Sequence, residues 1–123
     1  MPNRNKSMSF APIQKYKPGL FSVAYVTTPT EGSAMQLARE LIGRRMAGCI
    51  NIIPGVVSFF EWEGTIVEHQ ESLLLIKTRS SRVEELCTFV RENHPYSVAE
   101  VSVVPIENGN PAYLTWLCRM VTE

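Results

Sequence analysis

The alternation of apolar and polar residues divides the chain into strand-like and helix-like segments. Runs rich in β-branched and aromatic residues, bounded by proline, glycine or serine, predict strands over residues 20–28, 49–62, 65–78 and 97–105. Apolar residues that recur at three- and four-residue spacing predict helices over residues 30–47, 80–94 and 111–121. The predicted order is therefore β-α-β-β-α-β, followed by a terminal helix.

Capping residues mark the expected ends of the helices. Thr30 and Ser33 are the candidate caps at the start of the first helix, and Gly48 is its expected stop. Ser80 or Ser81 is the expected cap of the second helix. That helix carries a buried stripe at helical spacing, made of Val83, Leu86, Cys87 and Val90.

Residues 49–62 and 65–78 predict one long hairpin around a tight turn at Glu63-Gly64. Pro54-Gly55 interrupts the first strand and predicts a bulge or bend there. At roughly 3.3 Å per residue each strand would span about 45 Å, whereas a domain of this size has a radius of gyration of about 13 Å. The hairpin is therefore expected to bend at Pro54-Gly55 or to reach beyond its own core.

This element order predicts an α+β protein with a ferredoxin-like arrangement, in which a four-stranded antiparallel sheet carries two helices on one face. A chain of 123 residues is expected to form one such domain. Residues 19–123 are assigned to it, with the C-terminal helix as an addition. Residues 1–18 carry three prolines among polar residues and are expected to form a flexible basic tail.

The predicted strands are apolar on both faces, although helices would cover only one of them. Leu73 and Leu75 point to one side of the sheet, and Leu74 and Ile76 point to the other. Aromatic residues near the hairpin tip add apolar surface: Phe59, Phe60 and Trp62. Bare apolar surface of this extent favours association. We therefore expect an oligomer in which copies of the chain cover the open sheet face and the hairpin arms.

Charge is balanced overall but unevenly placed along the chain. Four basic and no acidic residues precede Glu31, and from Glu31 onward there are 8 basic and 12 acidic residues, a net charge of −4. This part has no bulk attraction for nucleic acid, and the aliphatic run 73–76 lacks the stacking aromatics of RNA-binding sheets. No run is long enough to span a membrane. Neither nucleic acid nor membrane is an expected partner.

The cysteines favour a reducing compartment. Cys49, Cys87 and Cys118 are odd in number and form no Cys-x-x-Cys pair. The start of the chain lacks the apolar segment of a secretory signal. A cytoplasmic location is therefore expected, with organellar targeting or phosphate binding by the basic tail as alternatives.

Catalytic motifs are missing from the sequence. Neither a nucleophile elbow nor a glycine-rich phosphate loop is present. An acylphosphatase-like enzyme would need an arginine-bearing loop after the first strand, and residues 27–33 contain no arginine. The chain is therefore not expected to be an enzyme.

His94, followed by Pro95 and Tyr96, is the leading candidate for binding chemistry, with a plain turn as the alternative. Imidazole suits Cu(II), Ni(II) and Zn(II), and cysteine sulfur adds affinity for such ions. An oligomer could bring His94 close to Glu100, to Cys49 or to its own copies in neighbouring chains. The other histidine, at position 69, is flanked by polar residues and is expected to be exposed.

Lys77 is unusual because it lies near the end of an apolar strand. A buried or half-buried lysine needs a partner, and Glu100 on another predicted strand is the candidate. That pair would be structural. Alternatively, Lys77 would supply the charge for an anionic ligand at a subunit boundary.

Four stretches together resemble the CutA divalent-cation tolerance proteins: AGCINIIPGVVSFFEWEGTI, LLLIKT, HPYSVAEV and NPAYLTWL. The resemblance covers roughly residues 22–121 in matching order and spacing. It implies a ferredoxin-like homotrimer, with long hairpins packed around a threefold axis and sheets that face inward. It also implies a link to tolerance of copper and other divalent ions, and an architecture similar to that of the PII signalling proteins.

The resemblance also points to individual residues. The expected metal ligands are His94, Cys49 and Glu100. The expected small-ligand residues are Lys77, Tyr96 and Trp62. Ser97 and Ala99 depart from the family pattern, since many relatives carry glutamate and often proline there. One acidic group is therefore absent beside the histidine.

Three functions are consistent with these residues. The first is a homotrimer that binds Cu(II) or another divalent metal weakly, without an organic cofactor, in the response to metal ions. The second is a PII-like regulatory module that holds a small anionic effector between subunits near Lys77. The third is a structural trimer that anchors or assembles other proteins, with the His-Pro-Tyr corner serving only as a joint.

Overall fold

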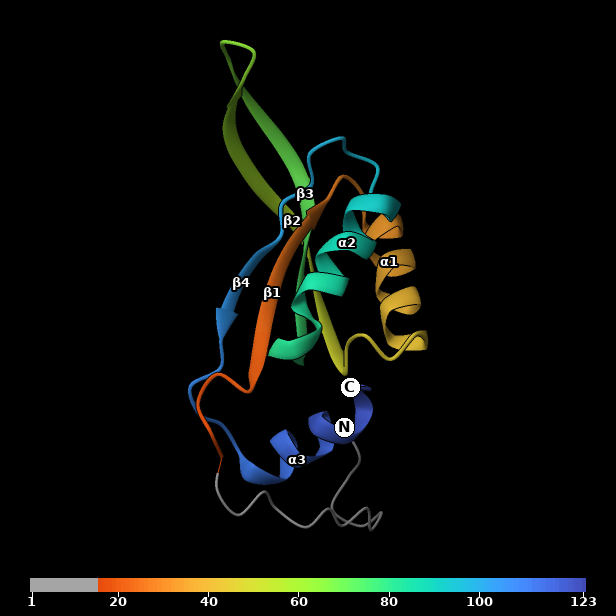
Figure 1. Ribbon diagram of the computed structural model, residues 1–123. Coiled ribbons are helices and arrows are strands. Elements are labelled where there is room, and N and C mark those ends of the chain that lie inside the picture. Colours follow the sequence, from red (N-terminus) through yellow and green to blue (C-terminus); the bar gives the residue numbers. More distant parts are fainter. Residues whose placement is uncertain (1–15) are drawn as a thin grey trace.

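The computed structural model describes residues 16–123, which form one sheet with helices packed against it (Figure 1). The strands are β1 (Phe21–Thr28), β2 (Cys49–Trp62), β3 (Thr65–Arg79) and β4 (Ser102–Pro105). The helices are α1 (Glu31–Gly43), α2 (Val83–Asn93) and α3 (Pro111–Met120), and a short 3-10 turn, η1 (Ser80–Arg82), precedes α2. No described helix is long and apolar enough to cross a membrane.

All neighbouring strands in the sheet are antiparallel, and their order is β2-β3-β1-β4. Helices α1 and α2 cover one face, and α3 lies at the end of the sheet opposite the hairpin tip (Figure 1). The predicted ferredoxin-like α+β fold is confirmed, as are the long hairpin and the extra C-terminal helix.

The strand register divides side chains between the two faces of the sheet. Ala24 lies opposite Ile76 and Val26 lies opposite Leu74, and all four side chains are fully buried against the helices. The alternate positions point away from α1 and α2, and we call this side the open face. Its apolar residues include Val23, Tyr25, Ile53, Leu73, Leu75 and Val104. None of these six is fully buried, so the predicted two-sided apolar sheet is confirmed.

Strands β2 and β3 form the predicted hairpin, which projects past the helices (Figure 1). Glu63 and Gly64 at its tip have φ angles of 51° and 79°, the pattern of a type I′ turn. The predicted bulge is also present, because the β2–β3 register shifts between Ile53 and Val56. Gly55 in this bulge has a φ of 74°, a conformation that glycine adopts without a Cβ penalty.

The helix caps agree only in part with the sequence. Thr30 is the N-cap of α1, where its Oγ1 accepts a hydrogen bond from the backbone N–H of Ser33 at 3.0 Å. The prediction for α2 is wrong, because Arg82 occupies the N-cap position and makes no side-chain cap. Ser80 instead donates its hydroxyl to the carbonyl of Gly19 at 2.6 Å, which ties the end of β3 to the start of β1.

Helix α1 ends earlier than predicted. Its last residue is Gly43, and the expected stop at Gly48 is wrong. The chain leaves the helix through Arg45, whose φ is 57°, while the backbone N–H of Met46 donates to the carbonyl of Leu41 at 3.0 Å. This is a Schellman ending. An arginine in the left-handed position gives no sequence signal, since glycine or asparagine normally marks it.

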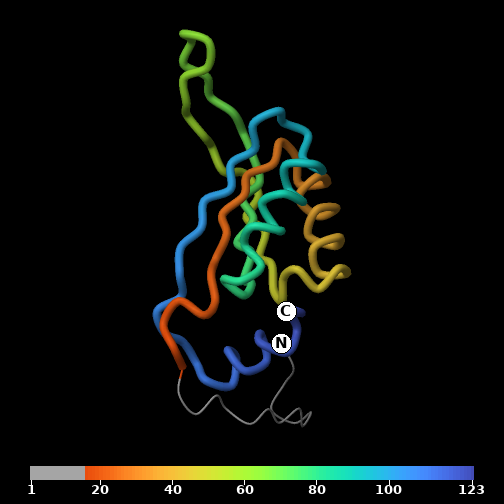
Figure 2. Tube along the Cα trace, in the orientation of Figure 1, coloured from red at the N-terminus to blue at the C-terminus, as the bar shows by residue number. Residues whose placement is uncertain are grey.

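Strand β4 is shorter than predicted. Only Ser102–Pro105 pairs with β1, whereas the prediction began at residue 97. Residues 94–101 form a loop that passes the base of the hairpin (Figure 2). We call this segment the corner loop, and side-chain contacts to β1 and β3 hold it in place.

Helix α3 docks through a second apolar cluster, which contains Phe21, Leu114, Leu117 and Val121. Tyr16 stacks on Phe21 with parallel rings and a centroid separation of 6.0 Å. The packed part of the chain therefore begins inside the segment that was predicted to be a flexible tail. Residues 1–15 of that tail lie outside the described residues.

Three arginines bind the C-terminal end of α3, and we call them the arginine clamp. Arg45, Arg79 and Arg82 donate hydrogen bonds to the carbonyl oxygens of Arg119, Val121 and Thr122 at 2.7, 2.9 and 2.6 Å, respectively. The last carbonyls of a helix lack partners within the helix, and cations there also interact favourably with its dipole. The clamp therefore holds α3 against the rest of the domain.

Candidate functional site

His94 connects the corner loop to the end of β1. Its Nδ1 accepts a hydrogen bond from the backbone N–H of Tyr96 at 3.0 Å. Its Nε2 lies 2.7 Å from the carbonyl oxygen of Thr27. Because Nδ1 is an acceptor, the ring is neutral and carries its proton on Nε2, which donates to Thr27. Both ring nitrogens are therefore occupied by backbone groups in the single chain.

Tyr96 fixes the corner loop to β3. Its hydroxyl donates to Oε2 of Glu71 at 2.9 Å, and Glu71 is only 6% exposed. Burial, followed by the hydrogen bond to Glu71, raises the pKa of Tyr96 from 10.0 to about 12. The contact thus pairs a buried carboxylate with a phenol that remains protonated at neutral pH.

Stability is expected to fall between pH 10 and pH 12 partly because of Tyr96. The folded state holds the phenol proton more tightly than the unfolded chain, so this contribution is complete below pH 10 and is lost as the pH rises towards 12. Tyr96→Phe should therefore flatten the fall in the free energy of unfolding over this interval. Urea unfolding at several pH values measures the slope, and identical slopes in both proteins would contradict the assignment.

A groove runs from the corner loop, which passes the base of the hairpin, to Trp62 beside the hairpin tip, and we call it the hairpin-base groove. Its volume is about 330 Å³. It is lined by Phe60, Trp62, His69, Pro95, Tyr96, Ser97 and Val98. Two of the predicted small-ligand residues, Trp62 and Tyr96, are thus brought together here. The third, Lys77, is not among the residues that line it.

Lys77 and Cys49 lie opposite each other on the open face, at the end of the β2–β3 hairpin away from its tip. The Nζ atom of Lys77 donates to Oδ1 of Asn51 and lies 3.4 Å from the carbonyl oxygen of Leu75. Cys49 is half-buried, and burial together with a hydrogen bond to Cys49 raises the pKa of Tyr113 to about 12. This end of the open face therefore combines an ammonium, a thiol and an amide.

The predicted pairing of Lys77 with Glu100 is wrong for the single chain. Across the sheet, Lys77 aligns with Val23 and then with Val104. Glu100 lies before β4 begins, and it accepts a hydrogen bond from the hydroxyl of Ser102 at 3.2 Å. The register is the reason, since it aligns Lys77 with Val104, which lies four positions along the chain from Glu100.

The three predicted metal ligands do not meet in one chain. His94 lies in the corner loop, Cys49 lies at the start of β2, and Glu100 precedes β4. Within residues 16–123, no group of three histidine, cysteine or acidic side chains is placed to hold a metal ion. A metal site that used these residues would need ligands from more than one copy of the chain.

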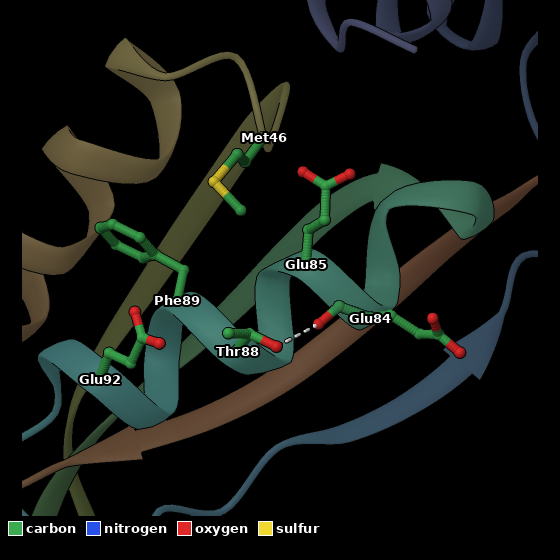
Figure 3. Close-up of a pocket in the computed structure, with 6 residues that line it drawn as sticks. All are labelled: Met46, Glu84, Glu85, Thr88, Phe89 and Glu92. Atoms are coloured by element: carbon green, nitrogen blue, oxygen red, sulfur yellow. Dashed lines mark hydrogen bonds between the residues drawn. The ribbon is translucent and has the colours of Figure 1, made fainter.

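A second hollow, of about 430 Å³, lies over α2 and contains none of the predicted site residues (Figure 3). It is lined by Met46, Glu84, Glu85, Thr88, Phe89 and Glu92. The carboxylates of the three glutamates point in different directions (Figure 3). Glu85 is paired with Arg82 at 3.0 Å. The hollow therefore offers an acidic surface rather than a converging ligand set.

Two residues around the hairpin-base groove were not predicted as site residues. His69 is exposed, as expected, but its ring also contacts that of Phe60 edge-on at 5.2 Å and lines the groove. Glu71 was not singled out, although it is the buried partner of Tyr96. The alternation of β3 places both on one face of the hairpin, and that alternation was the available signal.

Comparison with known proteins decides the family. The family model of the CutA1 divalent ion tolerance protein matches residues 22–120. The chain belongs to the CutA1 family. It is 50% identical to mouse Protein CutA over 108 residues, which cover 88% of this chain and 60% of the mouse protein. The chain thus spans about three fifths of the length of that relative.

Bacterial and plant members of the CutA1 family agree with this assignment. The Divalent-cation tolerance protein CutA of Thermus thermophilus is 43% identical over 95 residues, 77% of this chain and 92% of that protein. The crystal structure of CutA1 from Oryza sativa superposes with a TM-score of 0.83 at 42% identity, covering 86% of this chain and 95% of that one. A rice relative is named as chloroplastic, so the cytoplasmic location stays a prediction.

Proposed function

We propose that this CutA1-family chain forms a homotrimer that binds Cu(II) or a similar divalent cation weakly and contributes to tolerance of such ions. The observation that carries the proposal is the family match over residues 22–120. The Thermus thermophilus relative is named for divalent-cation tolerance. The proposal assigns the chain no catalytic step and no organic cofactor.

Self-association is supported by two exposed apolar surfaces. The first is the open face, where Tyr25, Ile53 and Val104 are 37%, 44% and 46% exposed. The second is the hairpin side that points away from the hairpin-base groove, where Phe59 and Ile66 are 68% and 76% exposed. Contiguous apolar surface of this kind marks an interaction site. In a homotrimer, further copies of the chain would cover both surfaces.

Weak metal binding is consistent with the state of the candidate ligands. Coordination by Nε2 of His94 would remove its proton and break the hydrogen bond to Thr27, at a cost of about 1 kcal/mol or more. Cys49 lies half-buried on the open face, where a neighbouring copy would approach it. Each site would therefore combine a histidine that must reorient with ligands from other copies, which opposes tight capture.

A structural role is the second candidate, and the bonding of His94 favours it. Both ring nitrogens already bind backbone groups, from Thr27 and Tyr96. An imidazole used in this way acts as a joint between β1 and the corner loop. In that case the homotrimer would serve to assemble or anchor other proteins.

Calorimetric titration of reduced, tag-free protein with Cu(II) tests the proposal. We expect saturable binding with a dissociation constant in the micromolar range, weakened by both His94→Ala and Cys49→Ser. His69→Ala is the matched control, since it removes the other histidine without touching the predicted ligands. Heats no larger than those of the buffer would contradict metal binding. Circular dichroism spectra of the variants establish that the fold is retained.

A further inference from the structure

We propose that the hollow over α2 binds the N-terminal segment of the same chain, residues 1–15, which precede the described residues. The hollow contains none of the predicted site residues. Helix α2 covers the face of the sheet opposite the open face, and the hairpin projects past it (Figure 1). The hollow therefore stays accessible when further copies of the chain cover the open face and the hairpin arms.

The hollow combines apolar and acidic side chains. Met46, which is 7% exposed, and the half-buried Phe89 supply the apolar part. The remaining lining residues are exposed side chains of α2, namely Glu84, Glu85, Thr88 and Glu92. Residues three or four apart share one side of a helix, so the acidic groups form a strip along α2. A strip of this kind suits an extended peptide better than a compact ligand.

The carboxylates of the hollow are only partly neutralised by the described residues. Glu85 is paired with Arg82 at 3.0 Å. Neither Glu84 nor Glu92 forms an ion pair with another described residue. The guanidinium of Arg44 lies over the aromatic ring of the hollow, 4.8 Å from its centroid. Because the carboxylates point in different directions (Figure 3), they complement a ligand with several spaced cations rather than one metal ion.

The N-terminal segment has the matching composition. It carries Arg4, Lys6 and Lys15 and contains no acidic residue. Its first two cations are followed by Met8 and Phe10, and these four residues occupy alternate positions with only asparagine and serine between them. Alternate side chains lie on one side of an extended chain. An extended segment would therefore present two cations and two apolar side chains to the same surface.

The described chain begins close to the start of α2. The backbone N–H of Ser80 donates to the carbonyl of Leu20 at 3.0 Å, and its hydroxyl donates to that of Gly19. Helix α2 follows Ser80 through η1, and it reaches Glu92 after about 20 Å at 1.5–2 Å per residue. Fifteen extended residues span up to about 50 Å. The segment is therefore long enough to reach the whole hollow.

Covalent attachment favours this segment over a separate basic peptide. A segment on a short flexible connection is present at an effective concentration in the millimolar range. Exposed ion pairs, which are individually weak, can then keep the hollow occupied. Traced back from Tyr16, the segment would bring its apolar pair to the apolar part of the hollow. Lys6 would then lie near Glu92.

Limited digestion of the full chain with chymotrypsin, followed by mass spectrometry, measures how accessible the bond after Phe10 is. We expect Glu92→Lys and Lys6→Glu each to speed this cleavage about tenfold, through loss of a closed state that is favoured tenfold. The combined variant exchanges the two charges and should restore the parent rate. Equal rates in all four proteins, or a combined variant cleaved as fast as the single ones, would overturn the proposal.

A variant that only moves a charge tests the alternation. Asn5→Lys combined with Lys6→Asn keeps the composition and turns the cation to the other side of an extended segment, so cleavage should be severalfold faster than in the parent. Glu31→Lys reverses an exposed glutamate of α1 outside the hollow. It is the matched control for Glu92→Lys and should be cleaved at the parent rate. An equal acceleration in Glu31→Lys would contradict a specific contact.

Methionine-methyl NMR of the full chain locates the contact. The methyl resonance of Met46 should shift in Lys6→Glu and also at about 0.5 M NaCl, which screens the ion pairs. Met35, which is exposed on α1 outside the hollow, should not respond. Faster cleavage without a Met46 shift would overturn the assignment to this hollow. A shift that grows with protein concentration would identify a second copy as the occupant and overturn binding within the same chain. The Cu(II) titration succeeds or fails independently of these results.

Discussion

Replacing Arg79 with methionine is expected to lower the free energy of unfolding by about 3 kcal/mol, because the hydrogen bonds from its guanidinium are charge-assisted and largely shielded from water. Its Nε donates to the carbonyl of Val121 at 2.9 Å, and its Nη2 donates to that of Cys118. Nη1 also contacts Glu123 at 3.2 Å, but that carboxylate is exposed and adds little. Methionine keeps much of the apolar stem and leaves both carbonyls without their donor.

Arg39→Met is the matched control for this prediction, since Arg39 is exposed on α1 and belongs to no clamp. Its effect should stay within about 0.5 kcal/mol. Urea unfolding followed by circular dichroism at equal protein concentrations measures both variants, because association makes stability depend on concentration. A similar small loss in Arg79→Met and Arg39→Met would contradict the role assigned to the arginine clamp.

Gly48→Ala is expected to cost about 2 kcal/mol through overpacking. A Cβ at this position would overlap Cδ1 of Leu117, which is fully buried, and would lie 3.3 Å from Cβ of Met120. The backbone cannot easily retreat, because the N–H of Gly48 donates to the carbonyl of Lys77 at 2.9 Å. Helix α3 would therefore have to move away from the sheet.

Gly43→Ala, five residues earlier in the chain, is the control for Gly48→Ala and is not expected to lower stability. A Cβ at Gly43 meets no atom within 4 Å, and this residue is the last of α1. Alanine there should leave stability unchanged or raise it by up to about 1 kcal/mol. The same unfolding measurement compares the two variants. A loss in Gly43→Ala as large as that in Gly48→Ala would show that close approach to α3 is not the cause.

The fold could be predicted because apolar periodicity and turn residues mark its main strands and helices within short stretches of sequence. The hairpin shows this most clearly, since the Glu63-Gly64 turn and the Pro54-Gly55 bulge both came from short stretches of sequence. The end of α1 was predicted wrongly because Arg45 takes a left-handed conformation there. The start of α2 was predicted wrongly because Arg82, at its N-cap position, belongs to the arginine clamp. In both places a contact distant in sequence outweighs the local preference.

The site was harder to predict because its contacts join residues far apart in the chain. Tyr96 and Glu71 are 25 residues apart, and His94 and Thr27 are 67 apart. The His-Pro-Tyr sequence indicated that His94 is a residue of interest. It did not indicate that both ring nitrogens of His94 bind backbone groups. The residue types in the corner loop predict that their side chains form polar contacts. Only the folded structure shows which of their polar atoms already have a hydrogen-bond partner.

The mass of the protein in solution tests the central claim most directly, which is that copies of this chain cover the open face and the hairpin arms. Static light scattering on tag-free protein is predicted to give three times the chain mass of 13.9 kDa, unchanged on dilution to low micromolar concentration. A species of 13.9 kDa under these conditions would contradict the account. It would leave the apolar open face exposed in the functional protein.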